Sequence, residues 1–561
     1  MEGIKSLIFA AVESLKDVLA KHECSVSWSS GKDSSVVLGL VMQAAASLKR
    51  AGVPVRPITV MHGDTTVENP EIRAYADKEI RAIERYARAL GIPLTVVVAR
   101  PNLTESWQVR VIGGRALPAM PGLNHDCAWS MKVEPMKRAR KVVLGDGARN
   151  IITVMGTRFE ESPQRAARMR ERGETPDKSW QGDDGNLYLS PIALWGTDDV
   201  WEYLGLARAG DSDVRTFSDF EDVFRIYSAG SGSSCAVVGD MAARGKSKPC
   251  GARTGCWCCT PAGRDKSLEA MIAGEERYGY MRGLNQLQRF LINTRWDFSR
   301  RLWLGRTLDD EGYVAIRPDV YSPDMLRELL RYCLTLDAEE RSAAASLGIA
   351  PRFEIISLQT LIAIDAMWNL QGYHKAFEAM RVFKDVVLDG NHYPVPEIAE
   401  YPRPQVLPKT QWLYVGLDYK DDSRLIGLRD LALEMVAEEG FGCMGTRTTR
   451  DGRTVLDVNT APAFEVDEEG AVLFMEFELD RVLLEQERGY LHQGPTDGYL
   501  YYSRMGILSL APQAISTVDE ILRRTWWKAQ HGWFGQVDTE VLLRASVPVK
   551  QEELLRHRQA A

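Results

Sequence analysis

Residues 24–41 constrain the fold of this chain more than any other stretch. They begin with alternating β-prone residues, pass through a turn of Ser and Gly, and end in apolar residues at helical spacing. The turn consists of Ser29, Ser30, Gly31, Lys32, Asp33 and Ser34. A turn that leads into a helix directs unpaired N–H groups and the positive end of the helix dipole at one point, where an anion can bind. Gly31 lets the backbone approach that anion. The stretch predicts a strand, a phosphate-sized turn and a helix; an ordinary capped helix start is the alternative.

The next segments alternate between strand and helix patterns. Strands are expected over 55–61, 94–98 and 151–155, and helices over 68–90 and 130–143. This βαβα alternation indicates an α/β fold with a parallel sheet and helices on both faces. In such sheets, ligands bind beyond the carboxyl ends of the strands.

Polar or small residues follow three of these strands directly. The segments are Ser29–Gly31, His62–Thr65 and Gly156–Arg158, and we expect them to converge at one mouth. Lys132, Arg158 and Arg165 are suited to neutralise phosphates there, since a guanidinium group can grip two oxygens at once. Asp33 or Asp64 is a candidate Mg²⁺ ligand, because Mg²⁺ prefers hard oxygen donors. Asp33 is equally suited to cap the helix, and both roles stay open.

Cysteines gather in the middle of the chain. Five of the nine lie between Cys235 and Cys259, a pattern that suits a reducing compartment and a metal site better than disulfides. Cys256 and Cys259 stand two residues apart, Cys250 supplies a third thiolate, and Cys235 is the natural fourth ligand. Spacing alone does not distinguish a structural zinc ion from an iron–sulfur cluster.

The remaining cysteines are expected to have different roles. Cys127 precedes Lys132 by five residues and is expected to face the same mouth, where nearby positive charge would favour its thiolate and its loading with sulfur as a persulfide. Cys24 begins a buried strand and is expected to be inert. Cys333 and Cys443 are expected to be structural.

The turn resembles the S-x-G-x-D-S signature of PP-loop ATP pyrophosphatases, which cleave ATP to AMP and pyrophosphate. Residues 62–70, 127–135 and 156–165 follow in the order found in the phosphoadenosine phosphosulfate reductase branch of that superfamily, and 191–201 resembles its closing helix. The resemblance implies an adenine nucleotide α-hydrolase-like fold, with ATP and Mg²⁺ as cofactors. The residues expected to bind them are Ser29, Ser30, Gly31, Lys32, Asp33, Ser34, Asp64, Gly156 and Arg165, and those expected in catalysis are Cys127, Lys132, Asp33 and Arg158.

The cysteine segment is similar to that of the DndC family of DNA phosphorothioation proteins and its SspD relatives. The similarity rests on residues 250–260 and 265–268, and it extends from the PP-loop to about residue 368. It implies a [4Fe–4S] cluster on Cys235, Cys250, Cys256 and Cys259, with zinc as the rival. Cys258 stands where the family has no cysteine, so it competes with Cys235 as the fourth ligand. The implied partners are DNA, a cysteine desulfurase that donates sulfur, and other phosphorothioation proteins of the same operon.

The organisation expected along the chain has four parts. A PP-loop domain is expected over 1–205, a cysteine-cluster segment over 206–275, a helical domain over 276–404 and a C-terminal α+β region over 405–561. The Pro-rich stretch over 393–408 has the composition of a linker. No apolar run reaches the roughly 18–20 residues of a membrane span, and the N-terminus lacks the pattern of a signal peptide, so we expect a cytoplasmic protein without a membrane partner.

The net charge of −8 does not favour nucleic acid, so any such surface must be local. The candidate strips mix positive charge with aromatic residues or concentrate arginine and lysine. They are 132–141, 165–172, 295–306 and 523–528.

These features predict an ATP pyrophosphatase that adenylates a DNA backbone phosphate and inserts sulfur. One alternative is a reductase of adenylyl sulfate type or a tRNA thiolation enzyme. The chain lacks the Glu-Cys-Gly-x-His tail on which such reductases rely. Another alternative is a non-catalytic, ATP-dependent scaffold that recruits partners to DNA.

Overall fold

A computed structural model describes the chain in segments. They are 2–120, 126–144, 151–182, 184–231, 255–261, 263–309, 311–416, 427–428, 446–448, 454–456, 464–511, 514–548 and 550. Contacts divide the chain into a first unit, Met1–Pro101 with Ala128–Asn285, and a second unit, Asn102–Cys127 with Gln286–Ala561. The domain boundaries expected at 205, 275 and 404 stay predictions.

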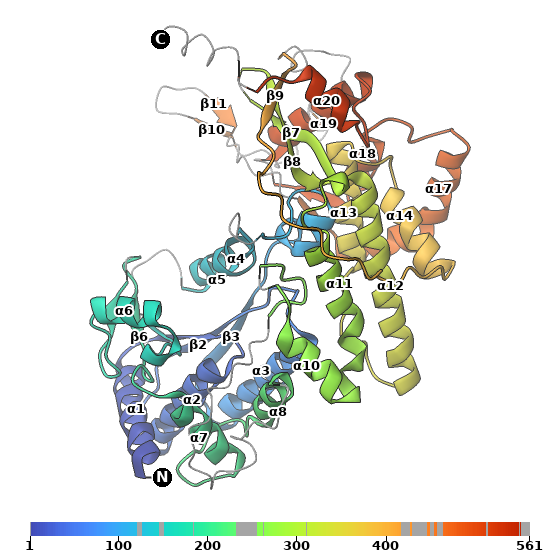
Figure 1. The fold of residues 1–561 in the computed structure, drawn as a ribbon. Helices are drawn as coiled ribbons and strands as arrows, with labels where there is room; N and C mark the ends of the chain where they lie inside the picture. The colour runs from blue at the N-terminus through green and yellow to red at the C-terminus, as the bar shows by residue number, and fades with distance from the viewer. Residues whose placement is uncertain are drawn as a thin grey trace. The chain divides into compact units, whose positions relative to one another are not determined.

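A six-stranded sheet in the order β3-β2-β1-β4-β6-β5 forms the centre of the first unit (Figure 1). Its strands are β1 (Cys24–Trp28), β2 (Ile58–Gly63), β3 (Leu94–Ala99), β4 (Ile152–Val154), β5 (Trp180–Gln181) and β6 (Leu187–Leu189). All pairings are parallel except that of β5 at the edge. The parallel sheet predicted from the sequence is confirmed, and β1 lies at its centre between β2 and β4.

Helices cover both faces of this sheet. They are α1 (Glu2–Lys21), α2 (Lys32–Arg50), α3 (Pro70–Leu90), α5 (Glu134–Leu144), α6 (Pro163–Glu171), α7 (Thr197–Arg208), α8 (Glu221–Gly230) and α10 (Lys266–Gly274). Figure 1 shows α2 and α3 on one face and α5 on the other. The apolar side chains of α2 and β1, such as Val26, Val36 and Leu40, are fully buried. Their burial fixes the turn between β1 and α2 on a rigid base.

The second unit combines helices with a three-stranded antiparallel sheet, β7-β8-β9. Its strands are β7 (Arg301–Leu308), β8 (Tyr313–Tyr321), β9 (Gln411–Tyr414), β10 (Thr446–Thr448), β11 (Thr454–Leu456), β12 (Phe464–Val466) and β13 (Leu508–Leu510). Its helices include α11 (Arg282–Asn293), which begins in the first unit, α12 (Pro323–Leu347), α13 (Leu358–Gln371), α14 (Glu378–Phe383), α16 (Glu468–Leu473), α17 (Leu479–Glu487), α18 (Asp497–Arg504), α19 (Ile515–Gln530) and α20 (Thr539–Ala545). The part expected to be helical therefore contains a β7–β8 hairpin, because Leu302, Leu304 and Ile316 alternate toward a buried face.

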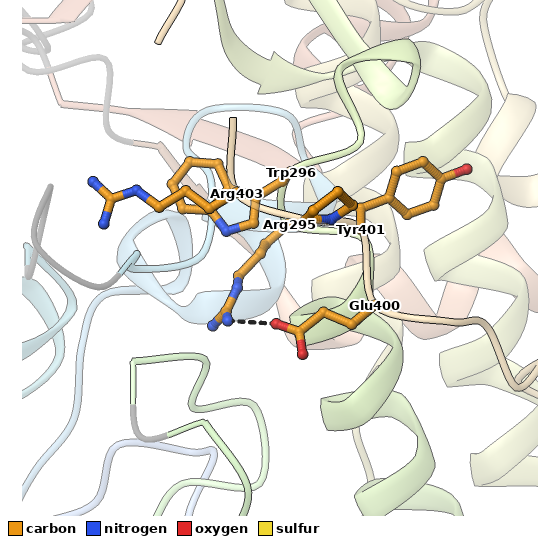
Figure 2. A pocket seen from close by; sticks show the side chains of 6 residues that line it. Arg295, Trp296, Glu400, Tyr401 and Arg403 are labelled. Carbon is orange, nitrogen blue, oxygen red and sulfur yellow. Dashed lines mark hydrogen bonds and ion pairs between the residues drawn. The ribbon is translucent and has the colours of Figure 1, made fainter. Parts of the chain in front are cut away.

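The Pro-rich stretch 393–408, here called the strap, is tied to the second unit rather than hanging free between domains. Asn293 Nδ2 donates to the Ile398 carbonyl (2.6 Å), and the Tyr401 amide donates to the Asn293 carbonyl (2.9 Å). Figure 2 shows Arg295 directed at Glu400 and Arg403 lying across Trp296. These residues, with Tyr401 and Pro402, line an open cavity of about 300 Å³.

Within the described residues, every helix is too short or too polar to cross a membrane.

Candidate functional site

Side chains of the turn after β1 bond to the turn itself. Ser34 Oγ accepts a hydrogen bond from the Ser29 amide (3.2 Å) and donates to the Gly31 carbonyl (3.0 Å). Ser30 has a φ of 59° and is 1% exposed, a backbone conformation that non-glycine residues rarely adopt. Its buried Oγ has no hydrogen-bond partner among the described residues. A strained residue with an unused buried hydroxyl fits a turn shaped for a ligand.

A second layer of side chains supports this turn. Ser35 Oγ accepts from Trp28 Nε1 (3.2 Å) and hydrogen-bonds to the Tyr75 hydroxyl of α3 (3.0 Å). The Lys32 amide at the start of α2 donates to the Tyr227 hydroxyl of α8 (3.4 Å). Helices α3 and α8 thus hold the turn.

Gly156, directly after β4, approaches the turn so closely that a side chain would not fit. A Cβ atom at this position would lie 2.9 Å from the Asp33 carbonyl carbon and 3.0 Å from the Ser34 nitrogen. Real Cβ contacts to backbone essentially never come below 3.0 Å. The absence of a side chain at Gly156 lets the loops after β1 and β4 meet.

A buried ion pair joins the same two loops. Arg158 Nε donates to Asp33 Oδ1 (2.7 Å), and Lys32 Nζ donates to Asp33 Oδ2 (2.7 Å). Arg158 is 2% exposed and also donates to the Trp195 carbonyl (3.2 Å). The N-cap residue of α2 is Gly31, without a side-chain cap, so Asp33 acts as an ion-pair partner and not as a helix cap.

The loop after β2 is fixed by Asp64. Its Oδ1 accepts from the Thr66 amide (2.8 Å), and its Oδ2 accepts from Arg100 Nε (2.8 Å). Thr66, like Ser30, has a positive φ, 65°. Both oxygens of Asp33 and of Asp64 already have partners, so a Mg²⁺ ion at either would have to displace one of them.

The cysteine segment lies against this same loop. Residues Glu68 and Cys256 form an antiparallel bridge, and the Trp257 amide donates to the Val67 carbonyl (3.0 Å). Burial raises the pKa of Cys256, while the positive charge of Lys132 acts in the opposite direction. Burial also raises the pKa of Glu68, with the charge of Asp64 adding to the effect and that of Lys132 opposing it. Lys132 therefore lies near the thiol and the carboxyl group.

Cys256 and Cys259 share one turn, in which the Cys259 amide donates to the Cys256 carbonyl (3.0 Å). Two thiols at this spacing fit a thiophilic metal or cluster. Cys235 and Cys250 lie outside the described residues. Within the described part of the chain, no group of three His, Cys, Asp or Glu side chains is arranged to hold a metal.

Other predicted site residues are distributed more widely. Arg165 begins helix α6, where it forms an ion pair with Glu161, and its side chain is half-exposed. Cys127 belongs to the second unit, so its predicted place at the mouth stays a prediction. Burial raises the pKa of Cys24 to about 12, which confirms an inert role. Cys333 is fully buried with a raised pKa, and Cys443 lies outside the described residues.

Two of the expected nucleic-acid strips are largely internal. Arg301 is 1% exposed with its guanidinium over Tyr321, and Arg300 pairs with Asp297 (3.2 Å). Arg523 is 7% exposed and pairs with Asp519 (3.1 Å). Neither strip is the continuous exposed surface that the sequence indicated.

The strand order and the loops at the centre of the sheet define a PP-loop domain of ATP pyrophosphatase type, a nucleotide-utilising class with the adenine nucleotide α-hydrolase-like fold. Residues 23–210 match the model of the phosphoadenosine phosphosulfate reductase domain. That match confirms the branch predicted for this part of the chain, whereas membership of the DndC family is not shown by it.

Comparison with solved structures finds low similarity over parts of the chain. FMN adenylyltransferase of Candida glabrata with FMN and an ATP analogue is 13% identical, with a TM-score of 0.23, over 41% of this chain and 62% of that one. The U34-tRNA thiolase NcsA of Methanococcus maripaludis with its [4Fe–4S] cluster is 14% identical, with a TM-score of 0.25, over 51% of this chain and 80% of that one. This chain thus spans less than two thirds of the adenylyltransferase. No curated protein matches the chain.

Sequence reasoning missed the residues that support the turn. Tyr75 and Tyr227 come from helices far along the chain, and no local motif marks them. The left-handed conformations of Ser30 and Thr66 also lack a sequence signal, because glycine is the usual residue there. Arg100 follows β3 directly, so the rule that placed the other loops at the mouth was able to find it.

Proposed function

We propose that the chain is an ATP-dependent sulfurtransferase that modifies the DNA backbone. The observation that carries the proposal is the contact of Cys256 and Trp257 with residues 67–68 of the loop after β2. This contact brings a pair of thiols to the carboxyl edge of the sheet that carries the phosphate-binding turn. Sulfur chemistry and nucleotide chemistry are thereby joined in one unit.

In the proposed reaction, a non-bridging oxygen of a DNA phosphate attacks the α-phosphorus of ATP, and pyrophosphate leaves. A persulfide sulfur then attacks the activated DNA phosphorus, and AMP leaves. A second thiol cleaves the remaining S–S bond and ends in a disulfide, which a thiol reductant restores. A cysteine desulfurase would supply the persulfide, with Cys127 as the proposed carrier.

The residues of the first unit suit the activation step. The N-terminus of α2 and the nearby Lys32 and Lys132 can stabilise negative charge that develops on phosphate. Arg158 keeps Asp33 and the turn in place rather than pointing freely at solvent. A cluster held by Cys256, Cys259 and the proposed ligands Cys235 and Cys250, or Cys258 in place of Cys235, would supply redox or sulfur-handling chemistry.

The test of the nucleotide step is pyrophosphate release from ATP by Ser34→Ala, compared with Ser47→Ala on the same helix. Ser34 Oγ holds the turn through two hydrogen bonds, so its loss is expected to lower the rate at least tenfold. Ser47→Ala is expected to behave like wild type. Equal rates for all three proteins would contradict the assignment of the turn.

The acceptor is tested in cells that express the chain with its neighbouring genes. Iodine cleavage of their DNA is expected with wild type and Ser47→Ala and lost with Ser34→Ala. Thiolated tRNA without DNA cleavage would favour the tRNA enzyme, and pyrophosphate release without either product would leave only the nucleotide step. A brown anaerobic preparation with visible absorption is expected for iron–sulfur, whereas a colourless protein containing zinc would contradict it.

A further inference from the structure

The second unit contains a buried lysine that is surrounded by positive charge. Lys528 lies on α19 and is 5% exposed. The charged groups that act on it are the guanidinium groups of Arg524 and Arg306. Buried lysines in proteins are normally paired with a carboxylate. Among the described residues, no carboxylate forms an ion pair with Lys528.

Its neighbours lie on the same helix and on a nearby strand. Arg524 precedes Lys528 by four residues, so the two lie on one face of α19, where like charges repel. Arg524 is 7% exposed. Arg306 comes from β7, and its buried Nε has no hydrogen-bond partner in the described part of the chain.

A fourth cation completes the group. The charges of Arg115, Arg306 and Arg524 all act on the buried Tyr373, and Arg306 also acts on Arg115. We call Arg115, Arg306, Arg524 and Lys528 the cationic cluster.

The acidic groups near the cluster are used by other arginines. Glu105 accepts from Arg110 (3.2 Å) as well as from Arg115 (3.0 Å). Asp319, whose charge reaches Tyr373, pairs with Arg317 (3.0 Å). These two carboxylates therefore leave the cluster with excess positive charge, which is costly in a desolvated place.

Hydrogen bonds hold the cluster in a fixed frame. The Tyr373 hydroxyl donates to the Gly114 carbonyl (2.8 Å), next to Arg115. Thr525 Oγ1, between the two cations of α19, donates to the Leu370 carbonyl (2.6 Å). The cations are thus anchored to neighbouring segments and cannot simply spread apart.

We propose that the cationic cluster binds an oxyanion of the phosphate type, either a free ion or a backbone phosphate of a nucleic acid. The forked guanidinium groups of Arg306 and Arg524 are suited to grip two oxygens each, and Lys528 adds a compact charge. This site goes beyond the proposed function, because it lies in the second unit and ATP cleavage in the first unit does not require it. Burial and the two arginines lower the pKa of Lys528 to about 7, as expected for a cation without a counter-ion.

The test is thermal unfolding of the full chain in potassium phosphate and in potassium chloride at equal ionic strength. Phosphate is expected to raise the Tm of wild type. Lys528→Met removes an uncompensated buried charge at similar length, so it is expected to raise the Tm in chloride and to abolish most of the increase caused by phosphate. Arg306→Gln is expected to weaken phosphate binding at least tenfold.

Lys384→Met is the matched control, since this exposed lysine pairs with Asp389 and its loss removes the same charge. It is expected to keep the phosphate-dependent increase, which also separates binding from the general stabilising effect of phosphate. Parallel titrations with inorganic phosphate and with a short single-stranded DNA distinguish the two sources, and protection by either one supports the site. A lower Tm of Lys528→Met in chloride, or an undiminished phosphate effect in that variant, would overturn the proposal.

Discussion

The loops of the first unit and the cationic cluster of the second unit treat charge in opposite ways. In the first unit, Asp33 pairs with Arg158 and Asp64 pairs with Arg100. In the second unit, Lys528 is acted on only by other cations. Paired charges fix the shape of a loop before a ligand arrives, whereas uncompensated cations reserve their interaction energy for an anion. The comparison teaches that the first site depends on geometry and the second on charge.

The two regions should therefore respond to mutation with opposite signs. Removing one partner of a buried pair leaves a charge uncompensated and destabilises the fold, whereas Lys528→Met relieves repulsion.

The largest effect is expected for Arg158→Leu. This change leaves Asp33 without its buried partner and is expected to lower the free energy of unfolding by about 3–5 kcal/mol. Urea unfolding measures it, with Arg165→Leu as the control. Arg165 is half-exposed, and its loss is expected to cost about 1 kcal/mol or less. Equal losses in both variants would show that the buried pair has no special role.

A comparable effect is expected from pH at Glu79, the carboxyl group of the first unit that departs from the pairing rule. Burial raises its pKa from 4.5 to about 7, and Ser218 Oγ donates to one of its oxygens (2.9 Å). The folded state therefore holds the proton more tightly, so Glu79 lowers stability as pH rises from about 4.5 through 7. The total loss by pH 8 is about 3 kcal/mol.

Urea unfolding of wild type and Glu79→Gln at pH 5 and pH 8 measures this contribution. The variant is expected to lose less stability than wild type between the two values, because glutamine carries no charge at either. An identical pH dependence in both proteins would place the titration elsewhere.

A smaller effect is expected for Gly156→Ala. The new Cβ would lie 2.9 Å from the Asp33 carbonyl carbon, so the turn has to shift at a cost of about 1–3 kcal/mol. Weaker ATP binding, measured by calorimetry, should accompany this loss. Gly205→Ala is the control, since its nearest neighbouring atom is 4.0 Å away. Unchanged ATP affinity in Gly156→Ala would separate the loop contact from nucleotide binding.

The smallest effect is expected for Tyr227→Phe. The change removes the acceptor of the Lys32 amide at 3.4 Å and is expected to cost about 0.5–1 kcal/mol. ATP affinity and urea unfolding together show whether this hydroxyl supports the turn or competes with the ligand. Tighter ATP binding at lower stability would indicate competition, whereas losses in both would indicate support.

Much of the first unit was predictable because its signals are local. The alternation of 24–28 and the helical spacing after Asp33 predicted β1 and α2, and residues 68–90 predicted α3, which begins at Pro70 with Asn69 as its cap. Parallel strands with polar ends also predicted that the loops after β1, β2 and β4 lie together.

The second unit was less predictable, for physical reasons visible in particular residues. Trp296 and Arg301 have the composition of a nucleic-acid surface, yet packing buries them. The strap has the composition of a linker, yet Asn293 and Arg295 tie it down. Burial and pairing depend on distant segments, which a local pattern does not contain.

The sequence by itself determined the phosphate-sized turn, the sheet behind it and the pair of cysteines at positions 256 and 259, because each follows from neighbours in the chain. Only the tertiary structure decided that Asp33 is an ion-pair partner, that Cys256 lies against the loop after β2, and that Lys528 is buried beside Arg524 and Arg306. Charge and burial are set by what the folded chain brings near, and that depends on contacts between residues far apart in sequence.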